Sequence, residues 1–332
     1  MIKKILYVGS KYEYSKKEKG SSLNKKAFYD NFIELGYDIT PVWYDEDVDD
    51  LQIRLLQLAD ELKPDMIFFI LQKQQIKKET LKTLQEKNNF LVNFFGDDQW
   101  RFDLYSKYYA NYFNVCITTD KFSVDKYKAI GQKNIIRSQW ASLKSKIKHI
   151  GVIYKYDVSF VGGANSYRKW FVYELEKRGI KVACFGDRWK NGRVSYSEME
   201  EIFSTSKINL NISNSAQFDI RYLLSSPINI LSTLKSRKNI SQTKARNFEI
   251  PNQGGFELTE YVPSLEDYFE LGKEIICYKD IDEVVMLIKY YLRHDNEREV
   301  IKKAGVERAR RDHSFKNRVA DFMIEIEGVY GK

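Results

Sequence analysis

The order of apolar runs and helix-spaced segments is the feature that most restricts the fold of this chain. An apolar run at 5–8 ends at Gly9, helix-spaced apolar residues follow at 23–35, and a second apolar run covers 38–44. Short continuous apolar runs are typical of parallel strands buried on both faces. A strand, a helix and a second strand in this order predict a doubly wound α/β domain. The same pattern predicts strands at 65–71, 90–95, 114–119 and 135–140, and helices at 51–62, 77–87 and 120–130.

The pattern starts again after the lysine-rich stretch 143–149, which we interpret as a linker, the alternative being a solvated helix end. A strand at 158–161, the tight turn Gly162-Gly163, a helix at 167–178 and a strand at 181–185 predict a second α/β domain. We therefore expect domains at 1–143 and from 150 onward. The stretch 218–234 is less regular and supports no assignment. Elsewhere we expect strands at 208–212, 256–261 and 275–278, and helices at 197–206, 282–292, 296–311 (broken by Gly305) and 315–326.

Length and charge narrow the class of protein. A chain of 332 residues is long for one core and natural for two domains. Its net charge of +8, from 54 Lys and Arg against 46 Asp and Glu, favours anionic partners. The lysines are spread along the chain without a nucleic-acid-binding motif, so only the charge supports DNA or RNA binding. Anionic nucleotides or an anionic membrane surface explain the charge equally well.

Cysteines and histidines are too scattered to indicate a metal or disulfide site. The three cysteines form no Cys-x-x-Cys pair, which favours a reducing compartment, and neither a zinc site nor a His triad is expected. We expect no cofactor. The longest apolar run, 66–71, has six residues, whereas a bilayer span needs roughly 18–20. The N-terminus reads as a first strand rather than a signal peptide, so we expect a cytoplasmic protein with, at most, peripheral contact at the inner face of the membrane. The residues concerned are Cys116, Cys184, Cys277, His149, His294 and His313.

The stretch 244–260, KARNFEIPNQGGFELTE, contains two cations and a carboxylate just ahead of a glycine pair. A helical turn at 245–250 would place Arg246 and Glu249 on one face, because they lie three residues apart. The pair Gly254-Gly255 allows backbone conformations that a side chain forbids. A cation and a carboxylate beside bare backbone N–H groups suit a ligand with phosphate and vicinal hydroxyls, as in a nucleotide sugar. The alternative is an Arg–Glu surface pair beside an ordinary turn.

Three other segments follow predicted strands, at the sheet edge where ligands usually bind in such folds. Gly162-Gly163 leads into a helix whose N-terminus can hold a phosphate, although an ordinary turn is the alternative. Asp187 and Trp189 are candidates to contact a base, or else form a turn with a packed indole. Asp97 and Asp98, ahead of Trp100 and Arg101, are either a site or a helix cap.

A tyrosine series and a polar strand complete the candidates. Tyr105, Tyr108, Tyr109 and Tyr112 recur at helical spacing, which predicts a buried helix face, with stacking on sugars as the alternative. Asn209 and Asn211 are the polar positions of the strand at 208–212.

Together these segments resemble the CgeB-like, or spore-maturation-protein-like, glycosyltransferases. The order of the motifs carries the resemblance, which covers most of the chain. In the first half it rests on 97–102 (DDQWRF) and 118–120 (TTD). In the second half it rests on 158–163 (VSFVGG) with Arg168, 185–189 (FGDRW), 246–251 (RNFEIP), 254–256 (GGF), 258–260 (LTE), 272–275 (GKEI), 290–292 (YYL), Glu297-Arg298 and 305–318.

The resemblance implies a GT-B fold, in which two Rossmann-like doubly wound domains face a cleft. The domain at 1–143 would bind the acceptor, and the domain at 150–312 would bind a nucleoside diphosphate sugar, most simply a UDP-sugar. The segment 313–332 would form a helix that crosses back to the first domain. The reaction implied is metal-independent transfer to a hydroxyl of a glycan, lipid-linked or protein acceptor, with retention.

The resemblance and the residues together suggest roles. Arg246 and Lys244 would hold the diphosphate with the backbone of Gly162-Gly163 and Gly254-Gly255, and Glu249 would bind the ribose. The remaining roles would be donor contacts by Arg168 and Asn211, base contacts by Asp187 and Trp189, and an acceptor-side base at Asp98.

Related retaining enzymes carry a second glutamate, and the corresponding position here is Ser241. This departure supports one rival function, a non-catalytic module that binds a nucleotide or nucleotide sugar. A nucleotide-sugar epimerase of similar fold is another rival, and a nucleic-acid-binding protein is the third.

Overall fold

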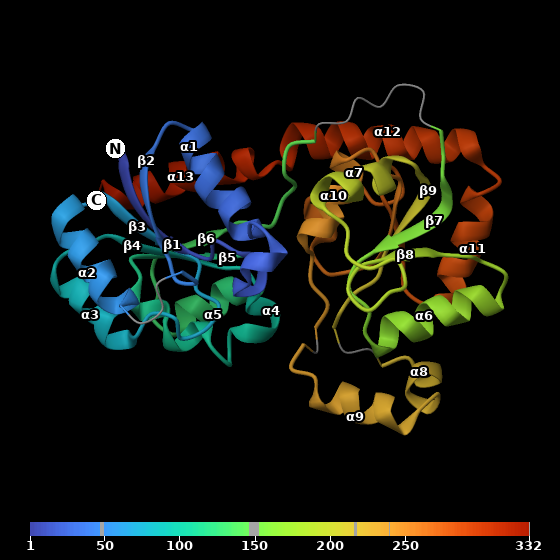
Figure 1. Ribbon diagram of the computed structural model, residues 1–332, viewed down its shortest axis with the longest axis horizontal. Coiled ribbons are helices and arrows are strands. Elements are labelled where there is room, and N and C mark those ends of the chain that lie inside the picture. Colours follow the sequence, from blue (N-terminus) through green and yellow to red (C-terminus); the bar gives the residue numbers. More distant parts are fainter. Residues whose placement is uncertain (47–49, 146–152, 216–217, 239, 332) are drawn as a thin grey trace. The chain divides into compact units, whose positions relative to one another are not determined.

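The computed structural model describes residues 1–46, 50–145, 153–215, 218–238 and 240–331 of the chain. These residues divide into two compact units (Figure 1). Unit 1 contains Met1–Leu143 and Phe315–Lys332, and unit 2 contains Lys144–Ser314. Of the predicted linker 143–149, residues 146–149 lie outside the described ranges. Within those ranges, none of the helices is both long and apolar enough to cross a bilayer.

Unit 1 is built on a six-stranded parallel sheet with the strand order β2-β1-β3-β4-β5-β6. The sheet grows outward in both directions from β1, as expected of a doubly wound domain. Its short central strands β3 and β4 are buried along their whole length. The strands are β1 (Lys4–Gly9), β2 (Asp38–Trp43), β3 (Met66–Phe69), β4 (Leu91–Phe95), β5 (Val115–Thr118) and β6 (Ile135–Arg137).

Helices cover both faces of this sheet. One face packs against a π-helical turn at Lys25–Tyr29, helix α1 (Asp30–Glu34) and the last helix α13 (Phe315–Tyr330). Phe68 of β3 stacks on Phe322 of α13 with the ring centroids 5.7 Å apart. The other face packs against α2 (Leu51–Leu62), α3 (Lys78–Glu86) and α5 (Ser123–Ala129). The last residues of the chain therefore complete the core of unit 1 (Figure 1).

Unit 2 contains a five-stranded parallel sheet with the order β11-β10-β9-β7-β8. One face is apolar and packs against α6 (Ser166–Lys177) and α11 (Ile281–Tyr291). The opposite face packs against α7 (Tyr196–Ser204) and α10 (Ala245–Asn252), and α12 (Asp295–Asp312) lies against α10. The strands are β7 (Tyr156–Val161), β8 (Ala183–Phe185), β9 (Ser206–Asn211), β10 (Glu257–Glu260) and β11 (Ile276–Tyr278).

Two predictions of local structure are wrong. The tyrosine series is not one helix, because 105–112 forms two short 3₁₀ turns, Ser106–Tyr108 and Ala110–Tyr112. Tyr105 and Tyr109 are buried, whereas Tyr108 is 54% exposed. Gly305 does not break its helix, since α12 runs without interruption from Asp295 to Asp312. The stretch left unassigned at 218–234 forms two helices, α8 (Ile220–Leu224) and α9 (Pro227–Lys235).

Gly305 is needed for close packing rather than for a break. A Cβ at this position would lie 2.2 Å from the carbonyl oxygen of Glu274. We expect Gly305→Ala to lower the free energy of unfolding of unit 2 by about 1–3 kcal/mol, because helix α12 must move away from that carbonyl. Urea titration followed by circular dichroism measures the change.

Gly328 provides the matched control, because it is also helical and its Cβ would meet no atom within 4 Å. Gly328→Ala should raise stability by about 0.5–1 kcal/mol through the better helix propensity of alanine. Equal effects of the two substitutions would contradict the packing role of Gly305.

Candidate functional site

Helix α10 is fixed to the sheet of unit 2 by a buried polar network. Asn247 of α10 donates through Nδ2 to Glu257 Oε1 and to Thr259 Oγ1 on β10, both at 3.0 Å. Asn211 at the end of β9 donates to the same Glu257 oxygen at 3.0 Å. Buried polar groups persist where they satisfy one another, so these bonds specify one position for the helix.

Glu257 is the centre of this network. Its side chain is buried, and burial raises the pKa of its carboxyl to about 8, against the lowering effect of the bonds from Asn211 and Asn247. Its other oxygen, Oε2, has no hydrogen-bond partner among the described residues. A neutral carboxylic acid is therefore the form that the site favours at pH 7.

The N-terminal end of α10 carries the charged residues of the site. Arg246 Nη1 lies 3.2 Å from Glu249 Oε2, so the two side chains share one face, as their spacing predicts. The guanidinium also lies 5.2 Å above the ring of Phe203 and contacts the sulfur of Met199. The side chain of Arg246 is 25% exposed and that of Glu249 is 7% exposed. The pair is thus held against the core of unit 2 rather than on an open surface.

A second cation lies at the neighbouring strand ends. Arg168 of α6 donates to the carbonyl oxygens of Gly163 at 2.8 Å and Ile212 at 3.1 Å, and to that of Ser213 at 3.2 Å. It therefore ties the turn after β7 to the end of β9. Burial, with a smaller effect of the nearby charge of Arg246, lowers the pKa of Arg168 to about 10. Two guanidinium groups that repel each other at one sheet edge make that edge attractive to an anion.

Lys244 and Glu260 extend this edge. The Lys244 ammonium donates to the side-chain oxygen of Asn214, just beyond β9. Glu260 ends β10, and its Oε1 accepts from Ser241 at 3.2 Å while its Oε2 accepts from the backbone N–H of Ser213 at 3.2 Å. Ser215 lies 2.7 Å from both Ser213 and Ser241. We call Glu260, Ser213, Ser215 and Ser241 the serine–Glu260 cluster.

None of the serine–Glu260 cluster is among the predicted site residues, although Ser241 was named as the position of a missing glutamate and Glu260 as part of the motif at 258–260. Its members come from two loops and a strand end that only the fold brings together. The available signal was position: Glu260 is the last residue of a predicted strand, and the carboxyl ends of parallel strands share one edge. Ser241 is thus not isolated, because it bonds directly to a carboxylate.

The two glycine pairs occupy different positions in unit 2: one follows a strand, and the other follows helix α10. Gly162 and Gly163 follow β7 at the edge that holds Arg168, and the N–H of Gly162 is bonded to the carbonyl of Phe185 at 2.8 Å. Gly254 and Gly255 follow α10, and their N–H groups donate to the carbonyls of Pro251 and Ile250, each at 2.9 Å. The prediction of bare amides at Gly254 and Gly255 is therefore wrong, since these groups close the C-terminal turn of the helix.

Trp189 and Asp187 lie in the turn after β8. The Trp189 indole N–H donates to the carbonyl of Gly162 at 2.9 Å, and the ring packs edge-on against Phe160. Asp187 lies 3.5 Å from Arg193, and both side chains are more than a third exposed. The indole thus holds the glycine turn in place through this hydrogen bond, while Asp187 remains open to solvent.

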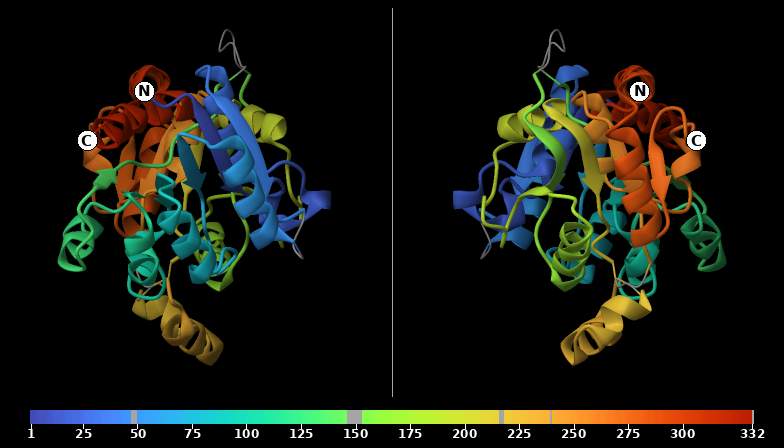
Figure 2. Two further views of the ribbon diagram at one scale, coloured as in Figure 1. Left: turned by 90° about the vertical axis from the view of Figure 1, so that its left-hand side faces the viewer. Right: turned by 90° about the vertical axis from the view of Figure 1, so that its right-hand side faces the viewer.

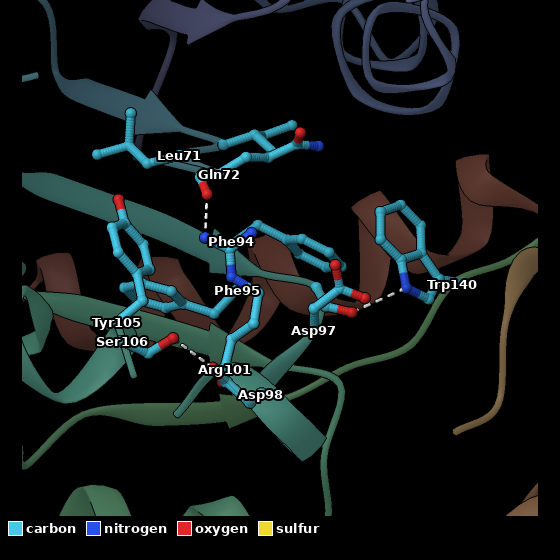
Figure 3. A pocket seen from close by; sticks show the side chains of 12 residues that line it. Leu71, Gln72, Phe94, Phe95, Asp97, Asp98, Arg101, Tyr105, Ser106 and Trp140 are labelled. Carbon is cyan, nitrogen blue, oxygen red and sulfur yellow. Dashed lines mark hydrogen bonds between the residues drawn. The ribbon is translucent and has the colours of Figure 1, made fainter. Parts of the chain in front are cut away.

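Unit 1 has a shallow pocket, open to solvent, at the carboxyl edge of its sheet (Figure 3). Residues after β3, after β4 and after β6 line it, among them Gln72, Asp97 and Trp140. Arg101 of the short helix α4 (Asp98–Arg101) donates to the carbonyl of Gln72 across the pocket wall. The Trp140 indole N–H donates to the Gly96 carbonyl at 3.0 Å. The pocket combines apolar rings with a carboxylate and a cation.

Asp98 belongs to the wall of this pocket. Its carboxylate accepts from the hydroxyls of Ser106 at 2.5 Å, Thr118 at 2.6 Å and Tyr127 at 2.8 Å. Burial raises its pKa to about 7. A general base must reach the proton that it removes, and the oxygens of Asp98 are taken by hydroxyls of its own unit. The geometry gives Asp98 a positioning role.

Among the residues that the structure describes, no three His, Cys, Asp or Glu side chains gather as a metal ion would require. The positive charges at the edge of unit 2 are guanidinium and ammonium groups, which bind phosphate oxygens directly.

Comparison with known proteins identifies the fold. A family model described as glycosyl transferase-like matches residues 168–324. A glycosyltransferase from Rickettsia africae is similar in structure, with a TM-score of 0.67, 8% identity and 98% of each chain covered. The HepE protein of Anabaena, crystallised with UDP, matches with a TM-score of 0.64, 9% identity, and 98% of this chain and 100% of that chain covered.

A third solved structure is the pneumococcal O-GlcNAc transferase GtfA with UDP and GlcNAc, with a TM-score of 0.56 and 11% identity. It covers 85% of this chain and 60% of that chain. A comparison with curated proteins finds no match. The chain therefore has the GT-B fold, with a parallel α/β sheet in each unit, as in these glycosyltransferase structures.

The raised pKa of Glu257 makes stability depend on pH. Between the ordinary pKa of 4.5 and the folded-state value of about 8, the unfolded chain loses this proton and the folded chain keeps it. Stability should therefore fall as pH rises through this window. Glu257→Gln keeps the acceptor for the two asparagines and removes the titration. We expect the variant to gain stability relative to the wild type from pH 5 to pH 8, by on the order of a few kcal/mol.

Urea titrations of both proteins across this range provide the measurement. Asp98 also titrates in this window, so the difference between the two curves, rather than either slope, reports Glu257. Parallel curves would contradict the buried neutral acid.

Proposed function

We propose that this chain is a glycosyltransferase that moves a sugar from a nucleoside diphosphate sugar to a hydroxyl of an acceptor. The observation that carries the proposal is the carboxyl edge of unit 2, where Arg168, Lys244 and Arg246 gather beside two carboxylates. The glycosyl transferase-like family match spans most of this unit, and the GT-B fold is that of the UDP-bound HepE and GtfA structures. A UDP-sugar is the donor that we propose first.

The donor site has a position for each part of such a ligand. Arg246 and Lys244, at the start of α10, bind the diphosphate together with the N-terminus of the helix. Gly162 and Gly163 let the backbone approach the phosphates closely, and Arg168 holds this turn in place. Glu249 accepts hydrogen bonds from the ribose hydroxyls.

The serine–Glu260 cluster is the proposed contact for the transferred sugar. Sugar hydroxyls need acceptors, and Glu260 supplies a carboxylate at the same edge as the diphosphate cations. The resemblance noted in the sequence would place a glutamate at Ser241, and Ser241 here bonds to Glu260. We infer that Glu260 takes over the hydrogen bonds of that missing carboxylate. Asp187 and Trp189 border the base. Asn211 does not contact the donor in this proposal, but helps to hold α10 in place through its bond to Glu257.

The chemistry proposed is metal-independent and retaining. The bond from the sugar's anomeric carbon to the diphosphate oxygen breaks, and the acceptor hydroxyl oxygen forms the new bond on the same face of the sugar. The hydroxyl proton passes to the departing diphosphate oxygen. Negative charge grows on the departing diphosphate, so fixed cations there stabilise the transition state more than the ground state. The acceptor binds in the unit 1 pocket, where Asp97 lines the wall and Asp98 holds Ser106, another residue of the lining, in place.

Three outcomes separate this function from its rivals in one experiment. The chain is incubated with UDP-sugars, with and without candidate acceptors, and the products are analysed by mass spectrometry and chromatography. Transfer or slow release of UDP supports the enzyme. Conversion of the donor into its epimer without acceptor would indicate an epimerase, and binding without any turnover would indicate a sensing module.

Two carboxylates should act on different parts of the donor. Glu249→Ala should weaken the binding of UDP by about tenfold or more, because a carboxylate–hydroxyl bond contributes roughly 1.5–3 kcal/mol. Glu260→Ala should leave the affinity for UDP unchanged and weaken only UDP-sugar binding. Isothermal titration with UDP and with a UDP-sugar tests both. A loss of UDP affinity in Glu260→Ala, or none in Glu249→Ala, would reverse the assignment.

Arg246 should act mainly on the rate. Arg246→Ala should lower kcat by about 10²–10³, the usual cost of losing one preorganised donor to a developing anion, with a smaller change in KM. Arg246→Lys retains the charge without the paired geometry, so its kcat should lie between those of the wild type and Arg246→Ala. Full turnover by Arg246→Ala would place the leaving group elsewhere.

A further inference from the structure

Helices α8 and α9 form an arm, defined here as residues 218–238, between β9 and α10. Figures 1 and 2 show the arm projecting away from the sheet and the other helices of unit 2. Its two connections to the unit pass through the serine–Glu260 cluster and Lys244. The arm thus stands at the same edge of unit 2 as the charged residues described above.

Helix α9 of the arm buries polar side chains and exposes aliphatic ones. On α9 the buried side chains are polar, Asn229 and Thr233, at 8% and 7% exposure. Most of its exposed side chains are aliphatic, and Ile228, Leu231 and Leu234 are 70%, 55% and 74% exposed. An exposed aliphatic stripe of this size marks an interaction site in a soluble protein. Ile230 of α9 is exposed as well, and further exposed apolar side chains lie on α8 and just before it, at Phe218, Ile220 and Leu224.

The arm is an ordered element, so its exposed stripe is not an accident of loose packing. Asn229 donates to the carbonyl of Tyr222 at 3.1 Å and to Ser225 at 3.0 Å, which joins α9 to α8. Tyr222 packs against Trp170 of α6, and Arg221 pairs with Asp282 of α11 at 2.6 Å. Internal bonds therefore hold the polar residues inward and leave the aliphatic residues outward.

The charges of the arm select its partner. The arm contains one acid, Asp219, which pairs with Arg221 at 2.8 Å, and from 220 to 248 every charged residue is cationic. Lys235 ends α9, and Arg237 and Lys238 follow within three residues. Aliphatic side chains bordered by lysine and arginine suit the boundary between lipid headgroups and acyl chains when the lipids are anionic. In a symmetric dimer through the arm, these cations would meet their own copies.

We propose that the arm is a docking surface for an anionic lipid membrane, with its aliphatic stripe entering the headgroup region and its cations contacting lipid phosphates. Helix α9 has nine residues, so it lies on the membrane and does not span it. The proposal does not depend on catalysis, and binding can be measured without any substrate.

Flotation of the full chain with lipid vesicles tests the proposal. We expect binding to vesicles of equal parts phosphatidylcholine and phosphatidylglycerol, and much weaker binding to phosphatidylcholine alone. Leu231→Ser with Leu234→Ser should weaken binding at least tenfold, since each leucine buries apolar surface on docking. Lys235→Gln with Arg237→Gln and Lys238→Gln should weaken binding to the anionic vesicles by roughly 100-fold.

The matched control is Met286→Ser with Val300→Ser on α11 and α12 of the same unit, whose side chains are 65% and 68% exposed. This variant should bind as the wild type does, and thermal melts should show that all variants fold. No binding to anionic vesicles, or equal loss in the control, would overturn the proposal. So would a dimer of the wild type that Leu231→Ser with Leu234→Ser converts to a monomer in sedimentation, because the stripe would then be covered by a second copy.

Discussion

The buried amide–carboxyl network under α10 is the interaction on which the candidate site depends. Asn247 on the helix and Asn211 on β9 both donate to one oxygen of Glu257. Apolar packing alone tolerates small shifts of a helix, whereas hydrogen bonds in a dry interior do not. The network therefore fixes the start of α10, and with it Lys244, Arg246 and Glu249, relative to the ends of β9 and β10.

This constraint explains the unusual composition of one face of the sheet. Residues that point toward α7 and α10 are Ser159, Asn209, Asn211, Glu257 and Thr259, while their neighbours on the same strands are apolar and face α6 and α11. A polar face costs hydrophobic stabilisation, which the larger apolar core on the other face supplies. The anion-attracting edge of unit 2 is then a consequence of where this polar face ends.

Much of the fold follows from the sequence because its strands are buried on both faces and its helices carry one apolar stripe. Such periodicity located the strands and helices of both units. The prediction of one helix through the tyrosines at 105–112 was wrong because helical spacing does not require a continuous helix. Two 3₁₀ turns bury Tyr105 and Tyr109 equally well. The helices of the arm at 218–238 were not predicted, because they bury polar residues and expose aliphatic ones, which reverses the usual amphipathic pattern.

The site was only partly predictable. Arg246 and Glu249 lie on one face as their three-residue spacing indicated, because that contact is local to one helix. Contacts across the fold were out of reach, among them the bond of Ser241 to Glu260 and the burial of Asp98 among three hydroxyls. Gly254 and Gly255 showed the right residue type for a phosphate turn, but the direction of the chain puts them at the far end of α10.

In the function that we propose, the start of α10 and the turn after β7 hold a nucleoside diphosphate. Hydrogen exchange of the full chain with and without saturating UDP, followed by mass spectrometry of peptides, tests it most directly. We expect slower exchange in peptides that cover 162–168 and 244–249, with little change in unit 1. Protection confined to unit 1, or no protection at any UDP concentration while other nucleotides also fail, would contradict it.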